Sequence, residues 1–120
     1  MRVEFLKGKI HRARVTDANV DYMGSITIDK ALMDAAGIYE YEKVLVADID
    51  NGNRLETYAI PAPPDSGTIC ANGAAARLIR PGDLVIIMSF ASVELLSEKP
   101  PKPKIVIMDE GSNKVKKLLP

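Results

Sequence analysis

Short stretches in which hydrophobic and polar residues alternate recur along most of the chain. The first covers residues 8–16, where alternation divides the side chains between the two faces of an extended strand. One face carries Lys9, His11, Ala13 and Val15, and the other carries Ile10, Arg12, Arg14 and Thr16. A second, β-branched stretch begins at Ser25, so residues 22–24 are predicted to form a connection that enters a strand.

One short helix and one hairpin have clear local signals. Asp29 can cap a helix over residues 30–36, and Gly37 suits the left-handed turn that ends a helix. Residues 43–49 and 53–60 flank Asn51-Gly52, which predicts a hairpin with a type I′ turn.

The rest of the chain reads as short extended segments between turns. Prolines at 61, 63 and 64 are expected to exclude a central strand, and residues 72–76 predict a tight turn that runs into a helical turn. Strands are expected over 84–95 and 105–108, with a frayed, lysine-containing tail after them. About six strands and two small helical pieces predict a single, compact, mainly β barrel.

Composition narrows the function classes. No apolar run approaches the ~20 residues of a membrane span, and the N-terminus lacks a secretory signal, so a cytoplasmic protein with no membrane partner is expected. Sixteen basic and sixteen acidic residues cancel, which removes the overall field that attracts nucleic acid. The first strand nevertheless concentrates cations that suit an anionic small molecule or a polymer: Arg2, Lys7, Lys9, Arg12 and Arg14.

Metals and nucleotide cofactors find little support in the sequence. One cysteine and one histidine cannot build a zinc site without several carboxylates, and one cysteine cannot form an internal disulfide. No P-loop and no glycine-rich dinucleotide motif is present. We therefore expect neither a metal nor a nucleotide.

Four ordered segments carry a more specific signal. They are Lys9-Ile-His-Arg12, Tyr22-Met-Gly-Ser-Ile-Thr-Ile-Asp29, Asn51-Gly-Asn-Arg-Leu-Glu-Thr-Tyr-Ala-Ile60 and Asn72-Gly-Ala-Ala-Ala76. Together they resemble the signature segments of the aspartate 1-decarboxylase family. The resemblance implies a double-psi β-barrel with short helical segments, assembled as a homotetramer with active sites near the subunit interfaces.

The resemblance also implies a chemistry. Decarboxylation of an α-amino acid leaves electrons on the α-carbon, and an electrophilic cofactor must accept them. In this family the cofactor is a pyruvoyl group made from the serine of a Gly-Ser pair, here Gly24 and Ser25, and neither a metal nor pyridoxal phosphate is required. The serine hydroxyl attacks the preceding carbonyl, and the resulting ester opens with eventual loss of ammonia. Two chains, 1–24 and 25–120, are expected, and a helper protein for cleavage is possible.

Family roles carry over to individual positions. Thr57 matches the residue that assists self-cleavage, and Tyr58 matches the one that returns a proton to the α-carbon, which suits a phenol because it is protonated at neutral pH. The substrate-binding positions are Lys9, His11, Arg54, Thr57 and Asn72, with the backbone of Gly73, Ala74 and Ala75. Without the family context, each of these residues has an ordinary structural role in a strand or turn, and Cys70 reads as a small buried apolar residue.

The function that follows is conversion of L-aspartate to β-alanine and carbon dioxide, which feeds pantothenate and coenzyme A synthesis. A second reading is a non-catalytic β-barrel module that binds peptide or nucleic acid through the basic first strand. A third keeps the chemistry but takes glutamate, because one methylene changes discrimination by only ~1–3 kcal/mol.

Overall fold

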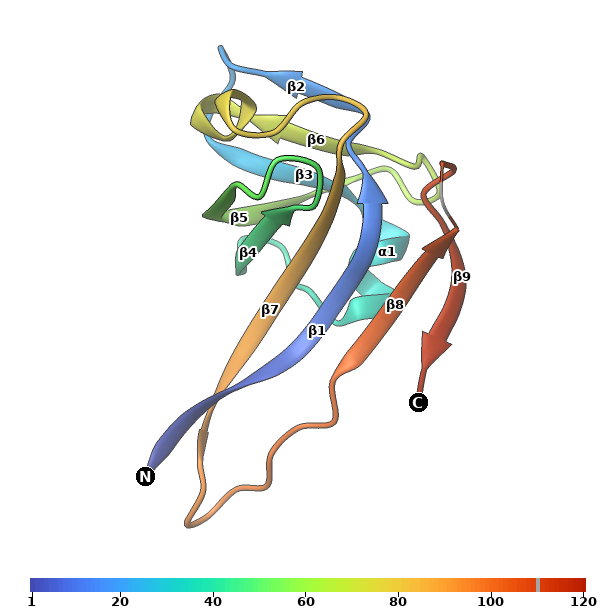
Figure 1. The fold of residues 1–120 in the computed structure, drawn as a ribbon. Coiled ribbons are helices and arrows are strands. Elements are labelled where there is room, and N and C mark those ends of the chain that lie inside the picture. Colours follow the sequence, from blue (N-terminus) through green and yellow to red (C-terminus); the bar gives the residue numbers. More distant parts are fainter. Residues whose placement is uncertain (110) are drawn as a thin grey trace.

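A mixed β-sheet forms most of the molecule. The computed structural model describes residues 1–109 and 111–120. Within these residues the strands are β1 (Arg2–Arg14), β2 (Asp17–Asn19), β3 (Ser25–Asp29), β4 (Lys43–Asp48), β5 (Arg54–Ala62), β6 (Ile69–Asn72), β7 (Leu84–Glu94), β8 (Lys104–Asp109) and β9 (Lys114–Leu119). They pair in the order β2-β6-β3-β5-β4-β7-β1-β8-β9 (Figure 1). The prediction of a mainly β fold is confirmed.

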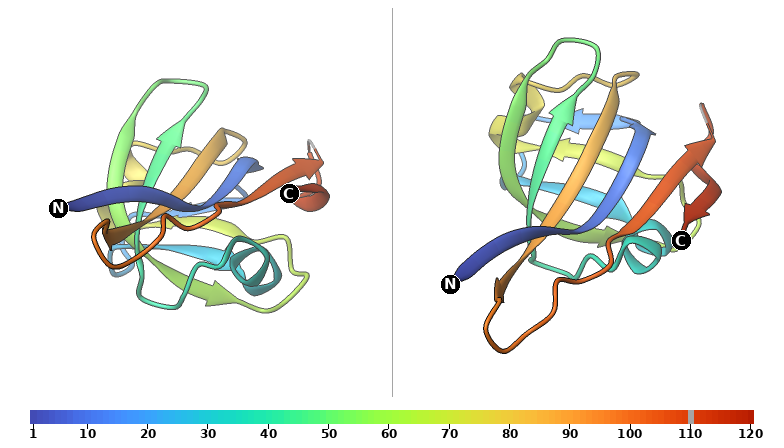
Figure 2. Two further views of the ribbon diagram at one scale, coloured as in Figure 1. Left: turned by 90° about the horizontal axis from the view of Figure 1, so that it is seen from below. Right: turned by 60° about the horizontal axis from the view of Figure 1, so that its bottom comes forward.

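The sheet curls into a small barrel (Figure 2). The residues just after β1 bring the two parts of the sheet together, because the N–H of Thr16 donates to the carbonyl of Ile69 in β6 over 2.8 Å. The pairs β1–β8, β2–β6 and β3–β5 are parallel, and the other pairs are antiparallel. This mixed, closed arrangement is compatible with the double-psi barrel that the family resemblance implies.

Two short helical elements lie between the strands, as predicted. Helix α1 (Lys30–Ala36) begins at Asp29, whose side chain accepts a hydrogen bond from the N–H of Ala31, and ends at Gly37 with a φ of 70°. The 3₁₀ helix η1 (Gly73–Arg77) follows β6 directly. No helix in the part of the chain that the structure describes is long and apolar enough to cross a bilayer.

Strand β1 departs from the predicted alternation at Arg12. The pairing of β1 with β7 shifts register between His11 and Ala13, and Arg12 has a φ of 67°. This bulge turns Ala13 and Val15 into the barrel interior together with Ile10, so their predicted place on the face of Lys9 and His11 is wrong. A bulge adds one residue to one strand, which exchanges the two faces beyond it.

The predicted hairpin forms, but its turn type was wrong. The N–H of Gly52 donates to the carbonyl of Asp48 over 2.9 Å. Gly52 has a φ of 78°, whereas Asn51 lacks the positive φ that a type I′ turn also requires. The side chain of Asp48 accepts hydrogen bonds from the N–H groups of Asp50 (2.8 Å) and Asn51 (3.2 Å), which stabilises a longer loop.

Two further predictions failed at the prolines and at the C-terminus. Strand β5 continues through Pro61 between β3 and β4, although prolines were expected to exclude a central strand. The N–H of Ala59 donates to the carbonyl of residue 42, and its carbonyl accepts from the N–H of residue 41. The nitrogen of Pro61, two residues later, points to the same side of β5. That side has no partner strand at this position among the described residues, so no ladder hydrogen bond is lost. The lysine-containing tail is not frayed either, because it forms β9 against β8.

Candidate active site

Ser25 lies at the point where an exposed connection becomes a buried strand. Tyr22 and Met23 are exposed, and Ser25, the first residue of β3, is only 2% exposed. On one side Ser25 pairs with Asn72 in the antiparallel β3–β6 ladder. The bond between Gly24 and Ser25 therefore joins an exposed connection to a buried strand, as the sequence predicts.

A chain of side-chain hydrogen bonds surrounds the Ser25 hydroxyl. Nδ2 of Asn72 donates to Oγ of Ser25 over 3.0 Å and to Oγ1 of Thr27 over 2.8 Å. Oγ of Ser25 donates to the carbonyl of Met23 over 3.3 Å. Sγ of Cys70 donates to Oδ1 of Asn72 over 3.2 Å. Adjacent positions of β3 and β6 thus hold the hydroxyl in a defined orientation.

The turn after β6 packs directly on the segment that contains Gly24. A Cβ atom on Gly73 would lie 2.8 Å from both N and Cα of Gly24 and 2.9 Å from the carbonyl oxygen of Tyr22. Gly73 also has a φ of 66°, a conformation that favours glycine. The structure therefore brings Gly73 and Asn72 to the Gly24–Ser25 bond, and Ala74 and Ala75 follow in η1.

An open cleft of about 680 Å³ lies beside this network. Its walls include Tyr22, Thr27, Ile60, Cys70 and Asn72. The cleft is large enough for a small amino acid, and it opens on the same polar side chains that hold Ser25.

Strand β5 presents its candidate residues on two different faces. The β4–β5 ladder has no register shift between Arg54 and Tyr58, so a bulge does not intervene. Thr57 lies opposite the buried Val44 and therefore faces the barrel interior. Tyr58 faces outward, beside the Tyr41 ring at a centroid distance of 6.2 Å.

The register of β3 and β5 decides which of these residues lies nearer to Ser25. Ile26 pairs with Ala59 in this parallel ladder, so one further step places Ser25 alongside Tyr58 on the outward face. Within the described residues, Thr57 makes no hydrogen bond to the Gly24 carbonyl. The proposed oxyanion role of Thr57 thus stays a prediction.

Lys9, His11 and Arg54 form no direct polar contact with Ser25 among the described residues of one chain. Strand β1, which carries Lys9 and His11, does not pair with β3. Arg54 is exposed at the start of β5 and lies opposite Ala47. None of the three shares a hydrogen bond or ion pair with Ser25 in the described part of the molecule.

The surroundings of His11 disfavour its charged form. Its Nδ1 is shielded from solvent and has no hydrogen-bond partner among the described residues. Burial, followed by the nearby positive charges of Lys9 and Arg12, lowers the pKa of His11 below its ordinary value. At neutral pH the imidazole is thus a hydrogen-bonding group rather than a cation.

Sequence reasoning missed Cys70 and Thr27 as parts of the site. Cys70 is half-buried and hydrogen-bonded to Asn72, not a plain apolar core residue. Alternation was the only available signal. Residues 25 and 27 lie on one face of their strand, residues 70 and 72 lie on one face of theirs, and the four side chains meet if the two strands pair. That pairing could not be read from the sequence.

Comparison with known proteins identifies the family. The family model described as aspartate decarboxylase matches residues 1–116. The chain belongs to the aspartate decarboxylase family. An aspartate 1-decarboxylase from Clostridium botulinum (strain Alaska E43 / Type E3) is 57% identical over 112 residues, which are 93% of this chain and 90% of the relative.

Two further relatives show the same breadth of similarity to this aspartate decarboxylase family member. The aspartate 1-decarboxylase of Caldicellulosiruptor saccharolyticus is 57% identical over 98% of this chain and 91% of its own length. That of Porphyromonas gingivalis is 54% identical over 96% of this chain and 98% of its own length. The similarity spans the whole barrel, including the segments that meet at Ser25.

Proposed function

We propose that this protein converts L-aspartate to β-alanine and carbon dioxide through a pyruvoyl group that it makes from Ser25, and so supplies pantothenate and coenzyme A synthesis in the cytoplasm. One structural observation supports this most directly: the Ser25 hydroxyl is buried and oriented by Asn72 next to the carbonyl of an exposed, closely packed Gly24 segment. Names of the relatives agree with the same substrate.

The residues around Ser25 suit self-cleavage. A bond forms between Oγ of Ser25 and the carbonyl carbon of Gly24, the Gly24–Ser25 amide bond breaks, and the hydroxyl proton passes to the Ser25 nitrogen. Loss of the Ser25 α-proton then expels the Gly24 carboxylate, and water replaces the nitrogen as ammonia. The hydrogen bond from Oγ to the Met23 carbonyl and the one from Asn72 leave one lone pair of Oγ free for attack.

The surroundings of Gly24 fit the new terminal group as well. A Cβ atom placed on Gly24 would meet nothing within 4 Å, and β3 stays paired with β5 and β6 after the cleaved bond. A ketone at position 25 supplies the electron-accepting centre that the reaction requires. Asn72 and Thr27 remain beside it to bind, and the adjacent cleft admits the amino acid.

Tyr58 is the proposed proton donor to the α-carbon. Its strand register places it alongside Ser25 on the outward face, whereas Thr57 faces the interior. The two residues therefore fit different steps. Tyr58 would donate a proton during decarboxylation, and Thr57 would assist self-cleavage from the interior face of β5.

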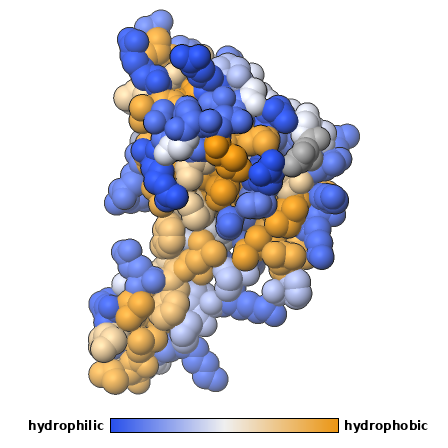
Figure 3. Space-filling view, in the orientation of Figure 1, coloured by the Kyte–Doolittle hydropathy of each residue, from blue (hydrophilic) through white to orange (hydrophobic). Residues whose placement is uncertain are grey.

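Arg54 and Lys9 are proposed to bind the two substrate carboxylates, with His11 as a hydrogen-bonding neighbour. The described residues show no hydrogen bond between Ser25 and Arg54, Lys9 or His11, and we propose that a neighbouring copy completes the site in a homotetramer. An exposed apolar arm supports this assembly. Hydrophobic side chains cover the projecting ends of β1 and β7 (Figure 3), where Met1, Phe90 and Leu96 are 74%, 42% and 88% exposed.

Intact-mass spectrometry with a product assay tests the proposal. The purified protein should separate into chains 1–24 and 25–120, with the larger chain lighter by one ammonia than simple hydrolysis would leave it. The processed protein should release β-alanine and carbon dioxide from aspartate, and much less product from glutamate. A single full-length mass after long incubation, with and without cell extract as a source of a helper, would favour a non-catalytic binding barrel.

A further inference from the structure

The hydrogen bonds around Ser25 run in one direction. Cys70 donates to Oδ1 of Asn72, Nδ2 of Asn72 donates to Ser25, and Ser25 donates to the Met23 carbonyl. A backbone carbonyl can only accept, so it fixes the direction at its end of the chain. The Ser25 hydroxyl must then accept from its other neighbour, and Asn72 must present its amino group there.

The opposite end of the chain depends on the Cys70 thiol. With both amino hydrogens of Asn72 directed at Ser25 and Thr27, Oδ1 needs a donor, and the thiol lies 3.2 Å from it. The alternative acceptor for the thiol, the Ala71 carbonyl, lies at 3.9 Å. Burial and, to a smaller extent, the charge of Asp17 raise the pKa of the Cys70 thiol, so it keeps its proton.

A reversed Asn72 amide would change the reacting hydroxyl. If Oδ1 faced Ser25, the hydroxyl proton would turn toward Asn72 and away from the Met23 carbonyl, and the amino group would meet the thiol. Hydroxyl groups accept either arrangement because they both donate and accept. Strand hydrogen bonds fix the backbone of Asn72 but not its carboxamide. The Met23 carbonyl at one end of the chain and the Cys70 thiol at the other together select its orientation.

We propose that Cys70 is a positioning residue for self-cleavage, because its thiol fixes the Asn72 carboxamide that orients the Ser25 hydroxyl. This inference rests on the proposed self-processing at Ser25. It assigns Cys70 no covalent step, and it distinguishes the residue from a simple space-filling member of β6.

Three variants separate donation from packing. Cys70→Val fills the space of the thiol and suits a strand but donates nothing, Cys70→Ala removes the sulfur, and Cys70→Ser keeps a donor. We expect Cys70→Val and Cys70→Ala to slow Gly24–Ser25 cleavage roughly three- to tenfold, as loss of one neutral hydrogen bond predicts. Cys70→Ser should cleave within about twofold of the natural rate, the scale of a weak change in one such bond.

A double-mutant cycle tests whether Cys70 acts through Asn72. Asn72→Ala should slow cleavage, and addition of Cys70→Val should cause no further slowing, because the group that the thiol holds is already absent. Rates that multiply in the double variant, or a Cys70→Val protein that cleaves like the natural one, would overturn the inference while leaving self-cleavage itself intact.

A measurement that needs no cleavage separates this inference from the proposed function. In uncleaved protein, side-chain amide NMR signals of Asn72 should shift and exchange faster in Cys70→Val, and Cys70→Ser should preserve them. If the natural protein never cleaves, the proposed function fails. The NMR signals of Asn72 would then be the only test of whether Cys70 orients its side chain. Unchanged Asn72 signals in Cys70→Val would refute that role.

Discussion

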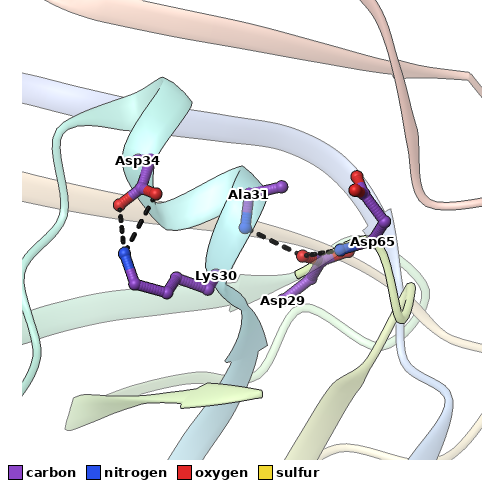
Figure 4. A network of polar contacts seen from close by, with 5 residues as sticks. All are labelled: Asp29, Lys30, Ala31, Asp34 and Asp65. Carbon is purple, nitrogen blue, oxygen red and sulfur yellow. Dashed lines mark hydrogen bonds and ion pairs between the residues drawn. The ribbon is translucent and has the colours of Figure 1, made fainter. Parts of the chain in front are cut away.

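The two ends of strand β3 both bury a polar side chain, yet they bury it in different ways. Ser25 and Asp29 are each 2% exposed. The Asp29 carboxylate accepts from the N–H groups of Ala31 and Asp65, each over 2.9 Å (Figure 4). It also accepts from the N–H of Gly67 over 2.9 Å. The Ser25 hydroxyl instead has two neutral partners. A carboxylate saturated by backbone donors anchors structure, whereas a hydroxyl with a spare lone pair beside a carbonyl can react.

The flanking segments extend this contrast. Asp29 leads into α1, whose Leu32 and Met33 are buried in the core. Ser25 follows a connection in which Tyr22 and Met23 are 60% and 77% exposed. One end of the strand therefore leads into a buried helix, whereas the other is preceded by an exposed connection that contains the bond proposed to break.

Ser25→Ala should have the largest effect, which is complete loss of self-cleavage in a folded protein. The methyl group keeps most of the volume but removes the nucleophile, and few hydrogen bonds are lost. Intact mass should show one chain after any incubation time, with a melting temperature close to that of the natural precursor. Two fragments from this variant would exclude Ser25 as the attacking group.

Tyr58→Phe should leave cleavage intact and lower turnover by ~10²–10⁴-fold, the range typical of a lost general acid. The ring keeps its packing against Tyr41, so only the phenol oxygen is removed. The measurement is β-alanine formation by fully processed protein, with hydrazine trapping as the control for an intact ketone. Near-normal turnover would assign the proton to another donor.

Asp29→Ala should lower the free energy of unfolding by about 3–5 kcal/mol, because three backbone donors lose a charged acceptor. Asp34→Ala is the matched control in the same helix. Asp34 forms only an exposed ion pair with Lys30 (Figure 4), so its loss should cost less than about 0.5 kcal/mol. Urea unfolding measures both, and similar losses would contradict the anchoring role of Asp29.

Gly73→Ala should slow self-cleavage by roughly tenfold to hundredfold, the scale expected when a reacting segment moves by about an ångström. The added Cβ would lie 2.8 Å from the backbone of Gly24. Gly52→Ala is the control, because Gly52 also has a positive φ but a Cβ there would meet nothing within 4 Å. Cleavage at equal rates in both variants would show that contact with Gly24 is unimportant.

Asp48→Asn should have the smallest effect of these substitutions, a change in the free energy of unfolding that depends on pH. Unlike Asp29, Asp48 has a buried oxygen, Oδ2, without a partner among the described residues. Burial, followed by the adjacent Asp83 carboxyl group, raises the pKa of Asp48 from 3.8 to about 6. Its contribution to stability is therefore full below pH 3.8 and lost as the pH rises through about 6.

An asparagine at position 48 can donate to Asp83 without taking up a proton. We therefore expect Asp48→Asn to raise the free energy of unfolding by about 1–2 kcal/mol at pH 8 and to have little effect near pH 3.5, below the ordinary pKa of an aspartate. Asp50→Asn, which removes a neighbouring exposed charge, is the control. Urea unfolding at the two pH values is the measurement. An equal change at both would contradict the explanation that the raised pKa of Asp48 destabilises the protein at high pH.

Local chemistry in the sequence determined several features directly. Asp29 and Gly37 mark the ends of α1, the segments around Asn51-Gly52 form a hairpin, and Ser25 begins a strand. These features depend on capping, turn residues and alternation within a few positions. The ordered segments around Gly24 and Ser25 also led to the family, which the comparisons then showed.

Only the tertiary structure decided what depends on strand register. Ser25 and Asn72 are 47 positions apart, and one residue of slippage in β3–β6 would turn Asn72 away from the hydroxyl. The bulge at Arg12 arises from pairing with β7, and Pro61 is tolerated because β4 pairing has ended there. Cys70 acquires a partner in the same way. Each of these features depends on which strand, distant in the sequence, pairs with the segment. Local sequence patterns do not determine that pairing.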